Sequence, residues 1–513
     1  MISRVHSSIL QGIDAVGCEV EADVSIGQSG EIKLVGLADA AVKESVSRIQ
    51  AALRNSGYRW PGPKVTINLA PADVKKDTAA FDLPIAVACM LAGGMFATEK
   101  IDDYLLLGEL ALDGRVRPVR GALATAMLAA GTKRRGLIVP AENAAEAAVV
   151  RDVEVIPVRF LTDAVGFLTD ELPVEPRAVD LESVFAVSGR YDVDFADVRG
   201  QESAKRALTV AAAGHHNVLM IGPPGSGKTM LAQRLPTILP PLTLPESLET
   251  TRVYSARGLL EPGQSLLAVR PVRTPHHSAS PASLVGGGAI PQPGEISLAH
   301  HGVLFLDEFP EFPRTTLEMI RQPLEDGCVT IPRVHSTLNF PARIMLVAAM
   351  NPCPCGYYTD PQRPCKCSPG AIERYMGRIS GPLIDRIDIH VEVPPVPWRQ
   401  LRAGDGDGQS SAAMREQVLR ARQVQRRRFD GEPRGQTTTN ATMSPRQVRR
   451  HCKLDAAGET LLKQAMTEMG LSARAHDKVL RIARTLADME GCESVAAHHL
   501  AEAVQYRRLD RRL

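Results

Sequence analysis

A glycine-rich segment near the middle of the chain has the residue types needed to bind a chain of phosphates. It consists of Gly222, Pro223, Pro224, Gly225, Ser226, Gly227, Lys228 and Thr229. Glycines let backbone N–H groups wrap around phosphates, a lysine ammonium reaches the β- and γ-phosphates, and a threonine hydroxyl can bind Mg²⁺. An apolar run at 216–221 precedes the segment and a helical pattern follows it. Strand, loop and helix thus occur in the order that this chemistry requires, which predicts a site for ATP and Mg²⁺.

Two carboxylates follow a second apolar run further along the chain. Residues 302–306 have strand length and lead directly into Asp307 and Glu308. We expect this strand to run beside the strand at 216–221, so that Asp307 approaches the Mg²⁺ and Glu308 approaches the attacking water. An apolar strand that ends in two acids is a weak signal by itself. Together with the glycine-rich segment, it predicts hydrolysis of the nucleotide.

A polar residue ends a third apolar run. Residues 343–350 lead into Asn351, whose amide can hydrogen-bond a γ-phosphate or the attacking water. An asparagine at a strand end is as often a simple turn former, because its side chain bonds the neighbouring backbone. We predict that Asn351 senses the γ-phosphate, with the turn as the alternative.

Four of the nine cysteines lie close together just after Asn351. They form two Cys-x-Cys pairs with nine residues between them, namely Cys353, Cys355, Cys365 and Cys367. Four thiolates suit tetrahedral zinc, but the gap within each pair is shorter than the usual gap of roughly two to four residues, so an iron–sulfur cluster is an alternative. Four unliganded thiols in a polar loop are a third possibility. We predict a structural zinc site that braces the loop after Asn351.

At 513 residues the chain is too long for one compact core. Its net charge of +2 gives no global sign of nucleic-acid binding. The longest uncharged apolar stretch, 83–98, is shorter than a membrane span and no signal peptide is visible, so we expect a cytoplasmic protein without membrane contact. The predicted parts are an N-terminal domain at 1–170, a linker at 171–190, a parallel-sheet core at 191–396 with the cysteine segment at 353–367, a linker at 397–412, and a helical domain at 413–513.

Two pairs of glycine and serine residues predict helix boundaries within the helical domain. Gly470 followed by Ser472 predicts the end of one helix and the N-cap of the next, and Gly491 with Ser494 repeats that pattern.

The order of these elements resembles that of the AAA+ ATPase family. The segments 275–278, 286–288 and 293–300, which lead into Asp307, resemble the magnesium-chelatase-like branch of that family, and specifically the bacterial ComM/YifB subfamily. The resemblance covers nearly the whole chain. It implies an α/β protein with a P-loop parallel-sheet core of the AAA+ type and a C-terminal helical lid.

By the same resemblance, two arginines are expected to act on the nucleotide. Arg386 would be the arginine finger and Arg474 the sensor arginine of the lid. Without the family context, a surface salt bridge would be the simpler explanation of either residue. A finger that acts on a neighbouring subunit implies head-to-tail contacts that close into a ring, and the resemblance implies a hexamer.

The N-terminal domain resembles the α+β proteolytic domain of Lon-type proteases in the segments 107–119 and 139–143. Those enzymes use a Ser–Lys dyad, in which the lysine amine takes the proton of the attacking hydroxyl. The corresponding positions in this chain are Ala80 and Leu123. The resemblance therefore implies a domain that is proteolytically inactive.

Positive charge is concentrated at 415–428 and 507–512. Such runs are usually solvated helix faces. A hairpin-like stretch at 329–338 carries Arg333 and His335 at its tip, and insertions at this place in related ring helicases face the central channel. By this resemblance, Arg333 and His335 would contact the DNA backbone without regard to base sequence.

These features together predict a ring-forming ATPase that moves along DNA and remodels it, as a helicase or in branch migration during recombination or natural transformation. ATP, Mg²⁺ and structural zinc are the expected cofactors, and DNA and further copies of the chain are the expected partners. One alternative is the motor subunit of a metal chelatase, against which the Lon-like domain and the cysteine segment argue. The other is a protein-remodelling ATPase whose Lon-like domain docks client proteins.

Overall fold

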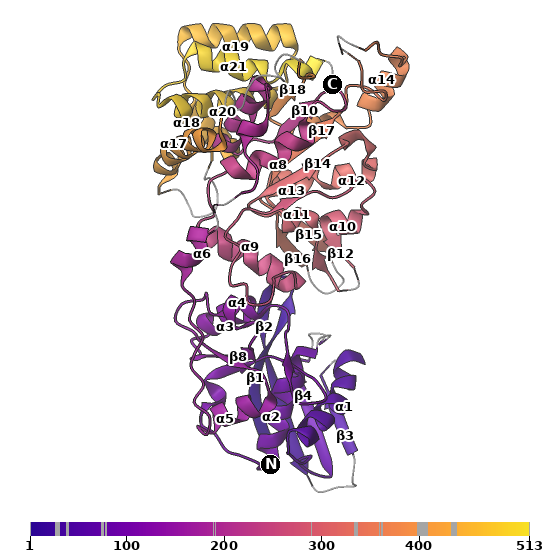
Figure 1. Cartoon of the computed structure of the whole chain (residues 1–513), viewed down its shortest axis with the longest axis vertical. Helices are drawn as coiled ribbons and strands as arrows, with labels where there is room; N and C mark the ends of the chain where they lie inside the picture. The colour runs from indigo at the N-terminus through magenta and orange to yellow at the C-terminus, as the bar shows by residue number, and fades with distance from the viewer. Residues whose placement is uncertain are drawn as a thin grey trace. The chain divides into compact units, whose positions relative to one another are not determined.

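The computed structural model describes residues 2–25, 31–36, 40–72, 76, 79–187, 189, 191–288, 290–332, 337–358, 360, 363–397, 409–431 and 439–511. The chain divides into two compact units (Figure 1). The first unit contains Met1–Val187, Thr243–Ala268 and Pro332–Phe340, and the second contains Ser188–Leu242, Val269–Ile331 and Pro341–Leu513. Among the helices of the described residues, none is both long enough and apolar enough to cross a membrane.

The first unit is built around one sheet and several short helices. Its elements are β1 (Ile2–Gln11), β2 (Asp14–Ser25), β3 (Glu31–Val35), α1 (Ala40–Asn55), β4 (Lys64–Ala70), η1 (Ala79–Phe81), α2 (Asp82–Ala92), η2 (Lys100–Asp102), β5 (Tyr104–Leu106), β6 (Glu109–Leu110), β7 (Val116–Arg117), α3 (Ala122–Gly131), β8 (Gly136–Pro140), α4 (Ala144–Ala147), β9 (Glu154–Val158), α5 (Leu161–Leu168), α6 (Leu181–Val187) and α9 (Leu244–Arg257).

The seven-stranded sheet of this unit has the order β3-β4-β2-β1-β5-β8-β9 and mixes parallel and antiparallel pairs. Its strand residues alternate between two apolar clusters. Leu106 and Ile138 belong to the cluster that contains α2, whereas Leu105, Leu137 and Val139 belong to the cluster that contains α3. Because successive side chains of a strand point to opposite faces, helices cover both faces of the sheet.

The two positions that correspond to the Ser–Lys dyad are buried in this unit. Ala80 is 4% exposed and lies in the cluster with α3, and Leu123 is fully buried in a cluster with Val149 and Leu266. Neither side chain has a group that could attack a carbonyl or carry a proton.

The second unit combines a parallel sheet with two groups of helices. Its elements are η3 (Phe195–Asp197), α7 (Glu202–Gly214), β10 (Val218–Ile221), α8 (Lys228–Ile238), β11 (Val272–Arg273), α10 (Pro281–Val285), β12 (Gly286–Gly287), β13 (Gln292–Pro293), α11 (Glu295–Leu298), β14 (Val303–Leu306), η4 (Phe309–Glu311), α12 (Arg314–Met319), α13 (Arg321–Asp326), β17 (Met345–Met350), α14 (Pro369–Met376), α15 (Gly381–Ile384), β18 (Ile389–Glu392), α17 (Ser411–Phe429), η5 (Asn440–Thr442), α18 (Pro445–His451), α19 (Ala456–Met469), α20 (Ala473–Glu490), α21 (Ala497–Gln505) and η6 (Arg508–Arg511).

The sheet of the second unit is entirely parallel and has the order β11-β14-β17-β10-β18. The prediction that the strand before Asp307 runs beside the strand before the glycine-rich segment was wrong, because β17 lies between β14 and β10. The physical reason is that β10, β14 and β17 are all apolar and buried on both faces, so their local sequences do not determine which of them lies in the middle.

The C-terminal helices share an apolar core with this sheet, because one cluster of buried residues runs from β10 and β17 into α17, α20 and α21. The predicted boundary between α19 and α20 is confirmed. Gly470 ends α19 in the left-handed conformation, and the Ser472 hydroxyl accepts a hydrogen bond from the N–H of Ala475 at the start of α20. The mixed α/β fold with a parallel sheet and a helical C-terminal region is likewise confirmed.

The second predicted helix boundary is confirmed at one residue and wrong at the other. Gly491 ends α20 as predicted, but Ser494 is not the N-cap of the next helix, since α21 begins at Ala497. The N-cap is Ala496, whose side chain accepts no hydrogen bond, and the helix instead reaches back to it: Nδ1 of His499 accepts the N–H of Ala496 at 3.0 Å.

Candidate nucleotide-binding site

The glycine-rich segment joins β10 to α8, and its glycines occupy positions that larger residues could not. A Cβ atom at Gly222 would lie 2.1 Å from the carbonyl oxygen of Val393. Gly225 and Gly227 have φ angles of 78° and 93°, in the left-handed region that side chains disfavour. Because α8 begins at Lys228, directly after Gly227, the N–H groups of its first turn are available to bind phosphate oxygens.

The ammonium group of Lys228 is buried against this loop. Nζ donates hydrogen bonds to the backbone oxygens of Gly222 at 2.7 Å and Pro223 at 2.9 Å, and to Oδ1 of Asn351 at 3.2 Å. Burial lowers the pKa of Lys228, and the nearby charge of Asp307 partly opposes that shift. Neutral oxygens therefore hold the cation, and phosphate oxygens in the loop would balance its charge better.

Thr229 and Asp307 meet at the carboxyl-terminal edge of the sheet, although their strands are not neighbours. Oγ1 of Thr229 donates to Oδ2 of Asp307 at 2.7 Å, and Oδ1 of Asp307 accepts the backbone N–H of Glu308 at 2.9 Å. A hydroxyl and a carboxylate are the hard oxygen ligands that suit Mg²⁺. These two side chains could therefore hold Mg²⁺ beside nucleotide phosphates.

Glu308 follows directly, and a histidine that the sequence did not assign lies against it. Glu308 has a left-handed backbone with φ of 52°, and its side chain is 57% exposed. Its Oε2 lies 3.0 Å from Nδ1 of His277, which comes four residues after β11. The family-like segment 275–278 was a sequence signal for His277, but it did not point to a contact with Glu308. The contact fixes the direction of a carboxylate that could orient water.

Gln201 is a second residue of this site that the sequence did not reveal. Its Nε2 donates to the backbone oxygen of Ser226 at 3.1 Å and to that of Pro394 at 2.6 Å. These bonds tie the phosphate-binding loop to the segment after β18. A single glutamine has no spacing pattern, so no sequence signal could have identified it.

The cysteine segment packs against the same loop. A Cβ atom at Gly356, where φ is 85°, would lie only 2.5 Å from Cδ of Pro224 and 3.8 Å from Cγ of Asn351. Asn351 in turn accepts the hydrogen bond from Lys228. The fold of the cysteine segment therefore bears directly on the shape of the nucleotide loop.

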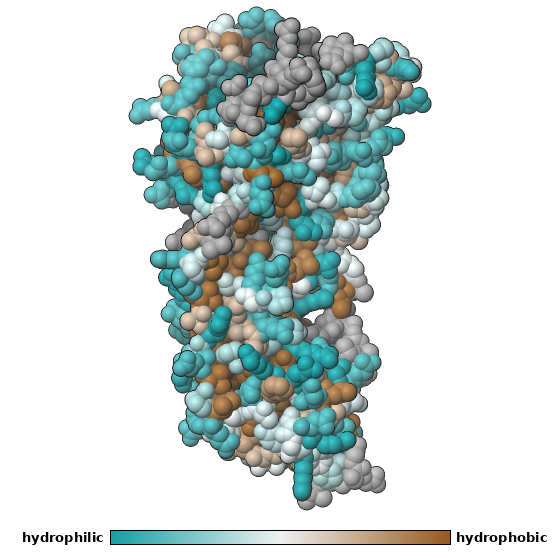
Figure 2. Space-filling view, in the orientation of Figure 1, coloured by the Kyte–Doolittle hydropathy of each residue, from teal (hydrophilic) through white to brown (hydrophobic). Residues whose placement is uncertain are grey.

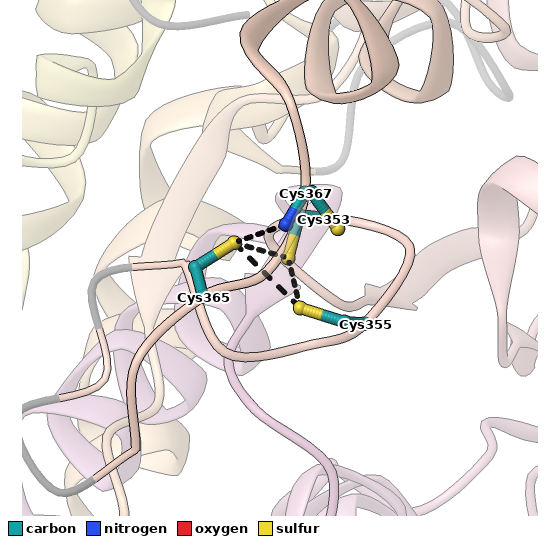
Figure 3. Close-up of side chains that lie close together, drawn as sticks. All are labelled: Cys353, Cys355, Cys365 and Cys367. Atoms are coloured by element: carbon teal, nitrogen blue, oxygen red, sulfur yellow. Dashed lines mark hydrogen bonds between the residues drawn. The ribbon is translucent and has the colours of Figure 1, made fainter.

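The four cysteine side chains converge (Figure 3). Sγ of Cys353 lies 3.4 Å from Sγ of Cys355 and 3.7 Å from Sγ of Cys365, and the last two are 3.6 Å apart. All four sulfurs, including that of Cys367, lie within 4.8 Å of one another. Four sulfurs at about 2.3 Å from a single zinc form a tetrahedron with edges of about 3.8 Å. An iron–sulfur cluster carries its thiolates on several different irons and so needs wider spacing. The geometry fits one tetrahedral ion.

The surrounding backbone favours the thiolate form that binds metals. N–H groups of Tyr357 and Lys366 lower the pKa of Cys355 to about 6, whereas burial and hydrogen bonds to the neighbouring thiols raise the pKa of Cys365 and Cys367. The N–H of Tyr358 points at Sγ of Cys353 at 3.3 Å, and the N–H of Cys367 points at Sγ of Cys365 at 3.4 Å. Such N–H contacts stabilise negative sulfur and orient it toward a cation.

The two predicted arginines lie elsewhere. Arg386 is 11% exposed and is held within its own chain, where it pairs with Glu325 of α13 and donates to the backbone oxygen of Pro382. Arg474 is exposed in the first turn of α20. Among the contacts of the described residues, neither arginine meets Lys228 or Asp307, so their roles stay predictions.

Two short strands flank the residues predicted to contact DNA. Arg333 and His335 lie outside the described residues, in the connection between β15 (Cys328–Pro332) and β16 (Thr337–Pro341). These strands form a two-stranded sheet of their own, as the hairpin pattern predicted.

A buried parallel sheet, a phosphate-binding loop between β10 and α8, a threonine–aspartate pair and a helical C-terminal region together define an AAA+ ATPase, with ATP and Mg²⁺ as its ligands. Three family models match the chain: "Magnesium chelatase, subunit ChlI" at 194–401, "Subunit ChlI of Mg-chelatase" at 20–143, and "Magnesium chelatase, subunit ChlI C-terminal" at 408–507. The chain belongs to the ComM/YifB family of magnesium-chelatase-like AAA+ ATPases.

Similarity to individual proteins supports this assignment. The chain is 43% identical to the competence protein ComM of Haemophilus influenzae, over 100% of this chain and 98% of ComM. It is 42% identical to the protein YifB of Escherichia coli K12, again over 100% of this chain and 98% of YifB. A stretch of 163 aligned residues, 29% of this chain and 28% of its relative, is 31% identical to Lon protease 2 of Bacillus subtilis. The predicted family and the predicted similarity to Lon proteases are thus confirmed.

Proposed function

We propose that this ATPase works in a ring of identical subunits that moves along DNA and remodels it, as a helicase or in branch migration during recombination or uptake of DNA. The observation that carries the proposal is the full-length similarity to ComM, which is named a competence protein. The nucleotide site is compatible with such a motor, because Thr229 hydrogen-bonds Asp307 and the charge of Asp307 acts on Lys228 in the phosphate-binding loop.

Each side chain of the site has a proposed role in hydrolysis. Lys228 binds the β- and γ-phosphates, Thr229 and Asp307 hold Mg²⁺, and Glu308 orients the attacking water. Asn351, hydrogen-bonded to Lys228, would exchange that partner for the γ-phosphate or the water. Charged and polar groups aimed at the phosphates stabilise the charge that develops in the transition state.

The two remaining arginines would complete the site in the assembly. Arg386 would act on the nucleotide of a neighbouring subunit, which requires it to leave Glu325. Arg474 would approach the nucleotide of its own chain when the lid moves.

We also retain as proposals the five-part division of the chain, a proteolytically inactive Lon-like domain, and a cytoplasmic location. The location is supported by nine cysteines that are all unpaired.

A chelatase motor is the second candidate, because the matching family models carry the name of a magnesium-chelatase subunit. The two candidates differ in what stimulates hydrolysis. A DNA motor should be stimulated by single-stranded or forked DNA, whereas a chelatase motor should respond to a porphyrin together with chelatase partner subunits.

We therefore expect DNA to raise the ATPase rate of the full-length protein and the porphyrin mixture to leave it unchanged.

Arg333→Glu is expected to weaken DNA binding on the order of tenfold, because it puts a negative charge against phosphates. Its rate without DNA should match the parent, and Arg314→Glu, an exposed arginine outside the hairpin, serves as control. Stimulation by porphyrin and not by DNA would favour the chelatase, and DNA affinity unchanged in Arg333→Glu would remove the hairpin assignment.

We propose that the four cysteines hold one zinc ion with a structural role. The double variant Cys353→Ser, Cys355→Ser is expected to lose about one metal ion per chain, measured by elemental analysis of the purified protein. It should also bind ATP less tightly, because Gly356 contacts Pro224 of the nucleotide loop. Cys492→Ser, an exposed cysteine outside the cluster, is the control. If the parent protein contains neither zinc nor iron, the proposal is wrong. If it contains iron together with sulfide, the four cysteines hold an iron–sulfur cluster and not zinc.

A further inference from the structure

The arginine-rich segment at 415–428 divides into two groups once it is folded. Arg422 and Arg428 have internal partners. Arg422 donates to the backbone oxygen of Ala212 at 2.9 Å, next to the carboxyl-terminal end of α7. Arg428 donates to Oδ2 of Asp488 at 2.7 Å and to Oδ1 of Asn440 at 3.0 Å. Arg422 therefore ties α17 to α7, Arg428 ties α17 to α20, and neither is available to a partner.

Three other arginines of α17 point to solvent, while Arg415 is half-buried. Its buried residues include Met414, Val418, Ala421 and Phe429, at the spacing of one helix face. Arg420 and Arg427 lie opposite this face, and Arg426 lies beside them. All three are exposed, and among the described residues none of them forms an ion pair. Unlike Arg422 and Arg428, they contribute no internal bond of the lid.

α18 carries a second set of exposed arginines. Arg446, Arg449 and Arg450 are exposed, while Gln447 and Val448 are buried. The ends of α17 and α18 meet, since the rings of Phe429 and His451 pack edge to face with their centroids 6.0 Å apart. The six exposed residues, here called the lid arginine cluster, are Arg420, Arg426, Arg427, Arg446, Arg449 and Arg450.

The stability of α17 and α18 alone does not explain why these two helices carry six exposed arginines. Basic side chains in the last turn of a helix interact well with its carbonyl end, but each contributes only about 0.3–1 kcal/mol and further like charges repel one another. The described acids on α17 and directly after it are Glu416 and Asp430, too few to balance the six arginines. The face of α17 and α18 that is seen in Figure 2 is mostly hydrophilic, although Leu419 of α17 is 40% exposed.

We infer that the lid arginine cluster binds the phosphate backbone of nucleic acid. This inference rests on the proposed DNA motor and adds a contact surface on the lid, made of residues other than Arg333 and His335. Guanidinium groups bind phosphates with two parallel hydrogen bonds. From Arg420 to Arg427 the helix rises about 10 Å, while the phosphates of one DNA strand follow at about 3.4 Å along the duplex axis. The stretch therefore spans several phosphates.

The test compares three full-length proteins in the presence of Mg²⁺ and a non-hydrolysable ATP analogue. They are the parent, the variant Arg427→Glu, Arg450→Glu, and the control Lys463→Glu, Arg508→Glu. The control makes the same change in net charge at exposed positions on α19 and η6 of the lid. Binding of a labelled single-stranded oligonucleotide of mixed sequence is followed by fluorescence anisotropy over a series of salt concentrations.

The cluster variant is expected to bind about tenfold more weakly than the parent near 0.1 M salt, and the slope of log affinity against log salt should become shallower by about one to two. The control should bind like the parent. ATP hydrolysis without DNA should be unchanged in the cluster variant, because neither residue lies in the nucleotide site. Arg427→Gln, Arg450→Gln should show a smaller loss in the same direction with unchanged thermal unfolding.

The outcomes separate this inference from the function on which it rests. If the parent binds DNA and the cluster variant binds it equally well with the same salt slope, the inference is wrong and the DNA motor stands. If the parent does not bind DNA at all, both fail. If the cluster variant changes the size of the assembly in the absence of DNA, the arginines form a contact between subunits and the inference is overturned.

Discussion

Lys228→Ala is expected to lower kcat/KM for ATP by on the order of 100-fold or more while the protein stays folded. Nζ of Lys228 contacts the glycine-rich loop and Asn351 at the same time, through bonds of 2.7 Å to Gly222 and 3.2 Å to Asn351. Its removal takes away the positive charge that would meet the β- and γ-phosphates. Folding should survive, because burial already makes the charged form of this lysine costly, as its lowered pKa indicates.

The matched control for this experiment lies two residues along the same helix. Met230 is 43% exposed, so Met230→Ala should change neither stability nor turnover measurably. Steady-state hydrolysis and binding of a fluorescent ATP analogue would be measured for the parent and both variants. Parent-like kcat/KM in Lys228→Ala would mean that the loop does not bind the transferred phosphate.

Glu308→Gln is expected to bind ATP like the parent but to hydrolyse it roughly 100- to 10,000-fold more slowly, the range for loss of a general base. The substitution keeps the size of the side chain and its ability to hydrogen-bond His277, which lies 3.0 Å from Oε2. What it removes is the negative charge that would orient and deprotonate water. Because ATP remains bound, the nucleotide-dependent assembly should persist and become visible by light scattering.

Glu311→Gln is the appropriate control for that variant. Glu311 lies in η4, three residues after Glu308, and pairs with Arg378 at 2.6 Å on the surface. Loss of an exposed pair of this kind costs about 0–1 kcal/mol of stability and should leave turnover unchanged. A parent-like rate in Glu308→Gln would show that another residue activates the water.

The local sequence was sufficient to predict the nucleotide loop. The residues of the loop follow one another directly between an apolar strand and a helix, so their conformations depend on near neighbours such as Gly225, Gly227 and Lys228. The same holds for the boundary between α19 and α20, because a left-handed glycine and a serine cap act within one turn. The cysteine cluster was also visible in advance, since two close pairs in one loop need little else to bring their sulfurs together.

Tertiary structure alone decided which strands are neighbours and which side chains meet. β17 lies between β14 and β10, although β14 precedes it in the chain, because sheet order depends on how whole strands bury their faces and not on any local pattern. The contacts of His277 with Glu308 and of Gln201 with Ser226 join segments that the sequence does not place together. The arginines of α17 divide in the same way. The sequence determined that they are numerous, but only the packing of the lid decided that Arg422 bonds within the fold and Arg427 faces solvent, because the two lie on different sides of one helix.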